Sequence, residues 1–350
     1  MTVLQRNPLK PLAITLGDAA GIGPEIIAQA FRQAPELLRG CFVVGDVQIM
    51  RRACQLVSGR QPALAQLSNP QEAWQTPPQC VPVWQVGPDL TPPAFGVVSA
   101  AAGQLAAQAV LWAAQAALCG DIAALVTAPL HKGALALAGP PYSNYPGHTE
   151  MLQAIAAQHA KQTLAQMPVR MMLANDELRV VLVSIHLALR DAIAAVTTER
   201  VLETLHVTHR ALLAILARAP RIAVAGLNPH AGEGGLFGRE ELDIIAPAIA
   251  QAQAAGLQVS GPFAPDTVFM RARADATRPS EFDVVVAMYH DQGLIPVKYL
   301  GVEKGVNVTL GLPLVRTSPD HGTAFDIAGT GRADPSSLLA AIRMAKQLSA

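Results

Sequence analysis

The sequence has few aromatic and few charged residues. Of its 350 residues only 4% are aromatic and 15% carry a formal charge, whereas 51% are hydrophobic. This composition argues against a disordered chain and predicts a large core built mainly from aliphatic side chains. Basic and acidic residues both number 26, so the formal net charge is zero. Proteins that bind nucleic acid usually carry a basic surface, and the sequence therefore disfavours that class.

Cysteine and long apolar runs are also scarce. The four cysteines lie in the first 119 residues and form no CxxC pair: Cys41, Cys54, Cys80 and Cys119. This spacing does not resemble a zinc site or a disulfide framework and predicts buried free thiols in a reducing compartment. No apolar run reaches the ~18 residues needed to span a bilayer. We therefore expect a soluble, cytoplasmic protein without a membrane partner.

Short β-branched runs alternate with helical patterns along most of the chain. This alternation predicts an α/β protein with a mainly parallel sheet, and the length suggests two domains or one large one. Residues 59–97 are rich in proline and glutamine and are interpreted as a variable excursion with one or two edge strands, including 81–86. Residues 261–267 are interpreted as a loop. The principal predicted strands are 12–16, 41–44, 122–126, 171–173, 178–183, 222–227 and 283–288, and the principal helices are 24–34, 98–120, 196–218, 240–254 and 334–349.

A glycine-rich turn, GDAAGIGPE, follows the first predicted strand and precedes a helix. Backbone N–H groups in such a turn can bind an anion. However, the spacing of Gly17, Gly21 and Gly23 does not fit the G-x-G-x-x-G dinucleotide fingerprint. The turn is therefore equally well interpreted as a tight structural connection or as a ligand-contacting wall.

Three of the nine histidines share a stricter pattern than the others. His186, His230 and His290 each follow a valine-containing predicted strand directly. If these strands are parallel and end at the same sheet edge, their imidazoles can meet and bind a divalent cation with an open position for substrate. Asp266 and Asp291 are candidate carboxylates for orienting the ligands or acting as a base. The alternative is three unrelated loop histidines.

Cationic groups are concentrated in the same part of the chain as His290. Lys298, Arg316 and the backbone of 305–311 offer positive charge to a phosphate or carboxylate. A serine or cysteine nucleophile is disfavoured, because the sequence has no G-x-S-x-G motif and no cysteine at a polar strand end. The residues thus favour a site that holds a metal or an anionic substrate.

Nine segments occur in this order along the chain: GDAAGIGPEI, TAPLHKGAL, YPGHTEML, IHLALRD, NPHAGEGGLFGREE, PDTVF, AMYHDQGLIPVK, GVNVTLGLPLVRTSPDHGTAFDIAG and GRADPSSL. Together they resemble the 4-hydroxythreonine-4-phosphate dehydrogenase family of pyridoxal phosphate biosynthesis. The similarity covers roughly residues 11–347 except 59–97. GDAAG stands where G-[DE]-P-A-G is commoner, and the proline of GLIPVK lies one place later than in GLPVLK.

The resemblance implies a two-domain α/β/α fold similar to the isocitrate and isopropylmalate dehydrogenases, with the active-site cleft between the domains. We place the domains at 1–135 plus 302–350 and at 136–301. The family also implies a homodimer with shared active sites. The second domain would carry the histidine strands and the dimer interface.

The implied activity is oxidation of 4-phosphohydroxy-L-threonine at C3 with NAD or NADP and one divalent metal, Zn, Mg or Co. The product, 2-amino-3-oxo-4-phosphooxybutanoate, would decarboxylate to 3-amino-2-oxopropyl phosphate. Alternatives are a paralogous 4-phospho-D-threonate or 4-phospho-D-erythronate 3-dehydrogenase, and a non-catalytic metal- or phosphate-binding protein.

Each implied role transfers to a matching position of this sequence. The metal ligands would be His186, His230 and His290, with Asp266 and Asp291 beside the metal. Lys132 or Asp291 would move protons, and this choice stays open. The substrate would be contacted by His148, Thr149, Lys298, Asn307 and Arg316.

Overall fold

In the computed structural model, which describes residues 9–274, 279–301 and 304–349, the chain divides into two compact units. The first comprises Met1–Lys161 and Pro313–Ala350, and the second comprises Gln162–Leu312. Segment 136–161 therefore groups with the first unit and the region up to Leu312 with the second, so both domain boundaries differ from those expected. The expected boundary at 302 also falls on residues 302–303, which lie outside the described ranges.

The first unit contains six neighbouring strands in the order β3-β4-β2-β1-β5-β12. Every recorded pairing among them is parallel. Ile14, Val43 and Leu125 are completely buried, as expected for strands covered on both faces. The strands are β1 (Leu12–Thr15), β2 (Cys41–Gly45), β3 (Ala63–Gln66), β4 (Cys80–Gln85), β5 (Ala124–Thr127) and β12 (Arg316–Pro319).

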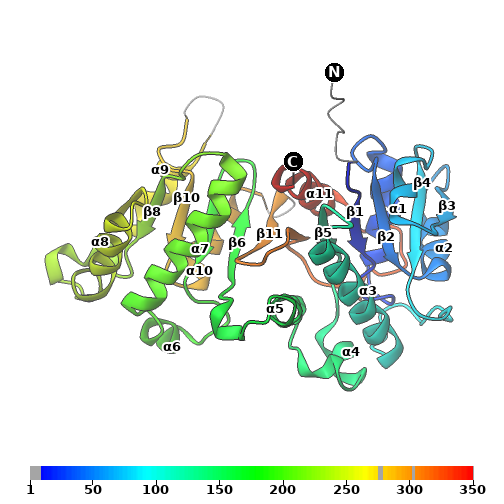
Figure 1. Cartoon of the computed structure of the whole chain (residues 1–350), viewed down its shortest axis with the longest axis horizontal. Coiled ribbons are helices and arrows are strands. Elements are labelled where there is room, and N and C mark those ends of the chain that lie inside the picture. The colour runs from blue at the N-terminus through cyan, green and yellow to red at the C-terminus, as the bar shows by residue number, and fades with distance from the viewer. Residues whose placement is uncertain (1–8, 275–278, 302–303, 350) are drawn as a thin grey trace. The chain divides into compact units, whose positions relative to one another are not determined.

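Helices cover the first sheet in two groups (Figure 1). The chain moves one way from β1 to β2 and back past β1 to reach β5, so right-handed crossovers place α3 on the face opposite α1 and α2. Helix α3 begins after Ser99, whose hydroxyl accepts from the Ala102 N–H, and ends at Gly120, which has φ 80°. The helices are α1 (Gly23–Gln33), α2 (Val47–Leu56), α3 (Ala100–Cys119), α4 (Lys132–Leu137), α5 (His148–His159) and α11 (Ser336–Leu348).

The second unit contains strands in the order β11-β6-β7-β10-β8-β9. β7, β10, β8 and β9 pair in parallel, whereas β6 is antiparallel to both β7 and β11. The strands are β6 (Arg170–Ala174), β7 (Arg179–Leu182), β8 (Ile222–Ala225), β9 (Val259–Phe263), β10 (Val284–Ala287) and β11 (Val306–Leu310). The helices are α6 (Leu189–Ala194), α7 (Thr198–Leu216), α8 (Ala246–Ala254), α9 (Pro265–Ala272) and α10 (His290–Tyr299).

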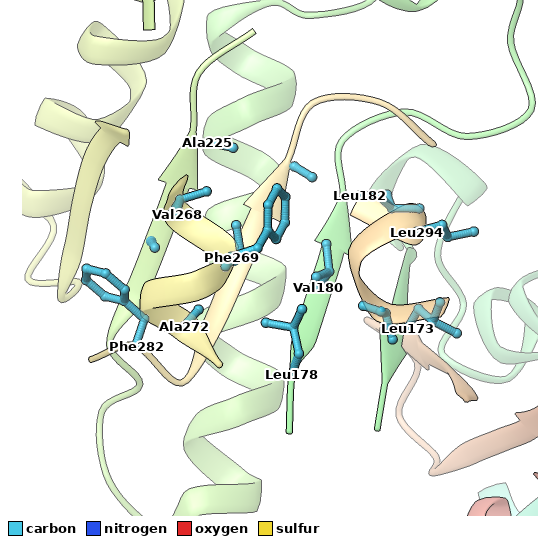
Figure 2. Close-up of a cluster of buried hydrophobic side chains, with 14 residues drawn as sticks. Leu173, Leu178, Val180, Leu182, Ala225, Val268, Phe269, Ala272, Phe282 and Leu294 are labelled. Atoms are coloured by element: carbon cyan, nitrogen blue, oxygen red, sulfur yellow. The ribbon is translucent and has the colours of Figure 1, made fainter. Parts of the chain in front are cut away.

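One face of the second sheet packs against α9 and α10 (Figure 2). Val268 and Phe269 of α9 and Leu294 of α10 meet strand residues such as Val180 and Leu182 in one buried cluster. Alternate strand residues point to the other face, where α7 contacts β6, β7 and β11. Because α10 begins at His290, this packing fixes the helix that carries one of the expected metal ligands.

The α/β class and most predicted elements agree with the structure, and four predictions need correction. Residues 261–267 are not a loop, because they contribute to β9 and α9. The residues after His290 form helix α10, which the sequence pattern did not predict. In the 59–97 excursion, the edge strand of the sheet is β3, whereas β4, which covers most of the expected edge strand 81–86, lies between β3 and β2. Among the cysteines, Cys119 is exposed, and the other three are buried free thiols.

No helix within the described ranges is both long and apolar enough to cross a membrane.

Candidate functional site

The three histidines predicted from strand ends follow three neighbouring parallel strands. His186 follows β7, His290 follows β10, and His230 follows β8, and β10 pairs with both of the other strands. The carboxyl ends of parallel strands lie at one sheet edge, where open α/β sheets bind ligands. The common edge assumed for these histidines is therefore present in the second unit.

His186 and His290 lie close together at this edge. Their ring centroids are 5.7 Å apart. The Nδ1 of His290 lies 2.7 Å from Asp291 Oδ1, which leaves its Nε2 as the remaining ring nitrogen. A carboxylate bound to the far nitrogen is the usual support of a metal-binding histidine. Asp291 is therefore suited to orient His290.

The backbone at two of the histidines is left-handed. His186 has φ 50° and His230 has φ 53°, values that residues other than glycine rarely adopt. Such strained conformations persist only where the surroundings impose them, and they cluster at functional sites. The local backbone thus sets the direction of both imidazoles.

Two cavities of the second unit meet at Tyr289 and Asp291. The larger, about 700 Å³, is lined by His230, Asp266 and Asp291 together with apolar side chains of α9 and α10. The smaller, about 290 Å³, is lined by His186, His290 and Asp291. Asp266, in the first turn of α9, thus lies on the His230 side.

The histidines are not assembled into a finished metal site. Within residues 9–274, 279–301 and 304–349, no group of three or more His, Cys, Asp or Glu side chains is arranged to hold a metal ion. The structure brings His186 and His290 together and places His230 across Asp291 in the adjacent cavity. Imidazole and carboxylate groups fit a borderline cation such as Zn²⁺, and binding would require His230 to approach the pair.

Side-chain hydrogen bonds that the sequence analysis missed hold these strand ends together. The Ser184 hydroxyl after β7 donates to the Met288 carbonyl after β10. The buried Gln292 amide donates to the Gly226 carbonyl after β8, and its oxygen accepts from the Met288 N–H. In the sequence, only the positions of Ser184 in the motif VSIH and of Gln292 in the motif YHDQG could have pointed to these hydrogen bonds.

In the first unit, a buried arginine lies at the edge formed by β5 and β12. Arg316 is 4% exposed, and its Nε and Nη2 donate to the Thr127 hydroxyl at 3.1 and 2.7 Å. Burial lowers the pKa of Arg316 to about 10, and the nearby Glu150 carboxylate opposes this shift. The guanidinium therefore stays charged at neutral pH and can bind an anion.

His148 lies near this arginine, at the start of α5. Its Nε2 is shielded from solvent and has no hydrogen-bond partner within the described part of the chain. Burial lowers the pKa of His148 well below 6.5, and the positive charge of Arg316 lowers it further. The structure thus brings two expected substrate-contacting residues together as a neutral imidazole and a cation. Thr149, the third such residue of this unit, is the next residue of α5.

Lys132 begins α4, which packs closely on α3. A Cβ on Gly103 of α3 would lie 2.0 Å from the Ala134 carbonyl, so only glycine permits this approach. A Cβ on Gly147 would lie 3.9 Å from Lys132 Cε, which places the lysine beside the segment that leads into α5. Lys132 therefore lies in the same part of the unit as His148.

The glycine-rich turn after β1 packs against the segment that follows β5. The Asp18 N–H donates to the Pro129 carbonyl at 2.9 Å, and a Cβ on Gly17 would lie 2.5 Å from the same oxygen. These contacts support the structural-connection interpretation. Burial raises the pKa of Asp18, although a hydrogen bond from the Ala20 N–H and the nearby His131 oppose the rise.

The remaining two expected substrate residues lie in the second unit. Lys298 is in the last turn of α10, and Asn307 pairs with Leu173 in the β11–β6 ladder. The amide of Asn175 donates to the Val297 carbonyl at 3.2 Å and joins the β6–β7 turn to the end of α10. The helix that carries Lys298 is thus fixed at both ends.

Known proteins resemble this chain over almost its whole length. A 4-hydroxythreonine-4-phosphate dehydrogenase of Beijerinckia indica is 51% identical over 338 residues, which cover 97% of this chain and 95% of the relative. A D-threonate 4-phosphate dehydrogenase of Salmonella typhimurium is 45% identical over 343 residues, or 97% and 99% of the two chains. The crystal structure of the 4-hydroxythreonine-4-phosphate dehydrogenase of Klebsiella pneumoniae matches with a TM-score of 0.84 and 41% identity, covering 97% and 98%.

The family model described as the pyridoxal phosphate biosynthetic protein PdxA matches residues 38–345. This range includes all the candidate site residues named above apart from the turn after β1. On this match and the identities above, the chain belongs to the PdxA family.

Proposed function

We propose that this protein is an NAD- or NADP-dependent, metal-dependent dehydrogenase that oxidises 4-phosphohydroxy-L-threonine at C3. The resulting 2-amino-3-oxo-4-phosphooxybutanoate then decarboxylates to 3-amino-2-oxopropyl phosphate. The observation that carries the proposal is the placement of His186, His230 and His290 at the ends of three adjacent parallel strands, in a chain 51% identical to a dehydrogenase of this name.

The three histidines are proposed to hold one divalent cation, Zn, Mg or Co. When bound, the cation would lower the pKa of the substrate hydroxyl, and the nicotinamide would accept the hydride. Asp291 orients His290 through its Nδ1, and Asp266 offers a second carboxylate on the His230 side. The protein therefore supplies imidazole nitrogens as ligands and nearby negative charge.

The substrate phosphate and its neighbouring oxygens need cations and hydrogen-bond donors. Lys298, Asn307 and Arg316 are proposed to lie near the phosphate end or the backbone oxygens of the substrate, and His148 and Thr149 are proposed to contact it as well. A planar guanidinium binds phosphate in bidentate fashion, and burial of Arg316 strengthens that attraction. The hydroxyl proton is proposed to leave through Asp291 or Lys132.

A second candidate substrate is D-threonate 4-phosphate. Relatives named for this activity are 43–45% identical over 97% of the chain, close to the 44–51% of relatives named for the first. Both substrates present a hydroxyl and a phosphate to the same groups. The 4-phospho-D-erythronate ester is a third compound of this kind. The candidate site residues therefore serve either substrate without change.

The test of the proposal is the metal content of a single variant. His230→Ala is expected to lose Zn²⁺ or Co²⁺ binding and turnover while keeping its circular dichroism spectrum. The substitution removes a proposed ligand from an exposed position and breaks no side-chain hydrogen bond of His230 within the described residues. The matched control is His159→Ala, which changes an exposed histidine at the end of α5. Equal metal content in the wild type and in His230→Ala would contradict the ligand assignment.

A further inference from the structure

Glu241 is a buried carboxylate next to the turn that carries His230. It is 2% exposed, and both of its oxygens accept hydrogen bonds. Oε1 accepts from the backbone N–H groups of Leu227 and Asn228, each at 2.7 Å, and Oε2 accepts from Asn228 Nδ2 at 2.9 Å. Burying a carboxylate is costly unless its lone pairs are satisfied, and charge-assisted bonds of this kind are about twice as strong as neutral ones.

The segment that follows Asn228 has an unusual backbone. Residues 230–234 all adopt left-handed conformations, including His230 with φ 53°, Ala231 with φ 54° and Glu233 with φ 44°. This conformation is unfavourable for each non-glycine residue, because Cβ comes too close to the following carbonyl oxygen. The turn therefore cannot persist through its own preferences, and contacts from outside it are required.

The turn is wrapped closely around the Glu241 carboxylate. A Cβ on Gly232 would lie 2.7 Å from Oε2, and a Cβ on Gly226 would lie 3.0 Å from Oε1. Asn228 extends the contact, because its Nδ2 also donates to Glu240 Oε2 at 2.6 Å. The carboxylate thus lies against Gly232 of the turn and accepts hydrogen bonds from the chain that leads into it.

Glu241 itself stands on a rigid support. It is the first residue of a π-helical segment, Glu241–Ile245, that continues into α8. Such π segments occur frequently at functional sites. A helix packed against β9 and α7 therefore anchors the carboxylate that holds the His230 turn.

We propose that Glu241 is a positioning residue that fixes the left-handed turn at 230–234 and thereby directs His230 toward a bound metal ion. The inference rests on the proposed metal role of His230. Glu241 does not touch the metal in this account. It acts through the backbone of Leu227 and Asn228, and its removal should loosen the metal site without removing a ligand.

The experiment is Co²⁺ titration of the full-length protein, followed by the visible absorption spectrum, for Glu241→Gln and a matched control. In Glu241→Gln the negative charge is lost, and the new amide faces Asn228 Nδ2 donor to donor. Loss of such supporting contacts typically weakens metal binding about 10–100-fold, and we expect a loss at the lower end with a shifted Co²⁺ spectrum. The control is Glu240→Gln. Glu240 accepts a hydrogen bond from the Asn228 side chain, whereas the backbone N–H groups of Leu227 and Asn228 bond Glu241. This variant should therefore keep the wild-type affinity and spectrum.

Hydrogen exchange of the 226–237 peptide provides an independent readout, because Glu241→Gln should exchange faster there with or without metal. If Glu241→Gln does not fold, Glu241→Asp takes its place, since it keeps the negative charge but draws the carboxylate back from the backbone N–H groups of Leu227 and Asn228. The same shifts are expected in that variant, and their absence would overturn the proposal.

Three results would overturn the inference in different ways. If the wild type binds no Co²⁺, the proposed metal site fails and the positioning role fails with it. If His230→Ala loses Co²⁺ binding but Glu241→Gln keeps the wild-type affinity, spectrum and exchange rate, only the role of Glu241 is wrong. A loss of equal size in Glu240→Gln would also overturn it, because the effect would then come from local charge rather than from the turn.

Discussion

Asp283, just before β10, is bound by two arginines. Arg218 donates to both of its oxygens at 2.8 and 2.7 Å, and Arg221 donates through its backbone N–H and its guanidinium. Burial alone would raise the pKa of Asp283, but these bonds outweigh it and hold the pKa well below 3.8. The carboxylate therefore stabilises the start of the strand that leads to His290.

We expect Asp283→Asn to lower the free energy of unfolding by about 2 kcal/mol at pH 7, because charge-assisted hydrogen bonds are lost. Since the folded pKa is depressed, the stabilisation is present above about pH 3.9 and is lost as the pH falls through the folded pKa. The difference between the two proteins should therefore shrink at low pH. Urea unfolding at several pH values measures both effects.

The control for this prediction is Asp243→Asn. Asp243 pairs with Arg239 at 2.9 Å, but both side chains are more than half exposed. Exposed pairs contribute about 0–1 kcal/mol, so the control should change stability little. If both variants lose the same free energy of unfolding, the bonds from Arg218 and Arg221 to Asp283 do not stabilise the fold as proposed.

His148 gives a second prediction for a single residue. Its pKa is lowered by burial and by Arg316, so its imidazole should stay neutral when an ordinary histidine, with a pKa near 6.5, gains a proton. Because only the unfolded chain takes up this proton, the contribution of His148 to stability is lost as the pH falls below about 6.5. Nuclear magnetic resonance of labelled histidine measures the titration. A midpoint for His148 at or above 6.5 would show that its ring is not held neutral by the fold.

At the scale of elements, the sequence predicted the strands better than the contacts between them. Valine-rich runs marked β7, β8 and β10, and the histidines after them share a sheet edge as predicted. Helix α10 was missed because Gly293 and Pro296 are poor helix formers, and tertiary packing overrides that preference. Residues such as Glu241 and Gln292 were missed because their partners lie up to 66 residues away in sequence. The metal assignment itself stays a prediction.

Helix α10 packs so closely on β7 that one position requires glycine. A Cβ on Gly293 would lie 2.5 Å from Leu182 Cδ2 and 2.7 Å from Val180 Cγ1. We expect Gly293→Ala to destabilise the protein by about 1–3 kcal/mol, the usual cost of overpacking a core. Because α10 starts at His290, the same variant should also weaken Co²⁺ binding. Urea unfolding and Co²⁺ titration measure the two effects.

Gly322→Ala is the control, because a Cβ there would meet nothing within 4 Å. Its stability and Co²⁺ affinity should match those of the wild type. If Gly293→Ala proves as stable as this control, the close packing of α10 on β7 is wrong.

For the whole molecule, we propose a homodimer whose active sites are shared. The second unit exposes large apolar side chains near the histidine edge, among them Leu189, Phe237 and Ile295, which are 58, 49 and 63% exposed. Exposed apolar patches commonly mark subunit contacts. Sedimentation at assay concentration should therefore give the mass of a dimer, and a fully active monomer would contradict the proposal.

The most direct test of the central claim is the rate of NADH formation with 4-phosphohydroxy-L-threonine, D-threonate 4-phosphate and 4-phospho-D-erythronate, each with and without a chelator. The account predicts turnover of the first compound that disappears with chelator and returns when Zn²⁺, Mg²⁺ or Co²⁺ is restored. If the enzyme turns over either of the other compounds faster, the assignment of the site residues stands and the proposed substrate is wrong. Turnover that is unaffected by chelator, or no turnover of any of the three, would contradict the account.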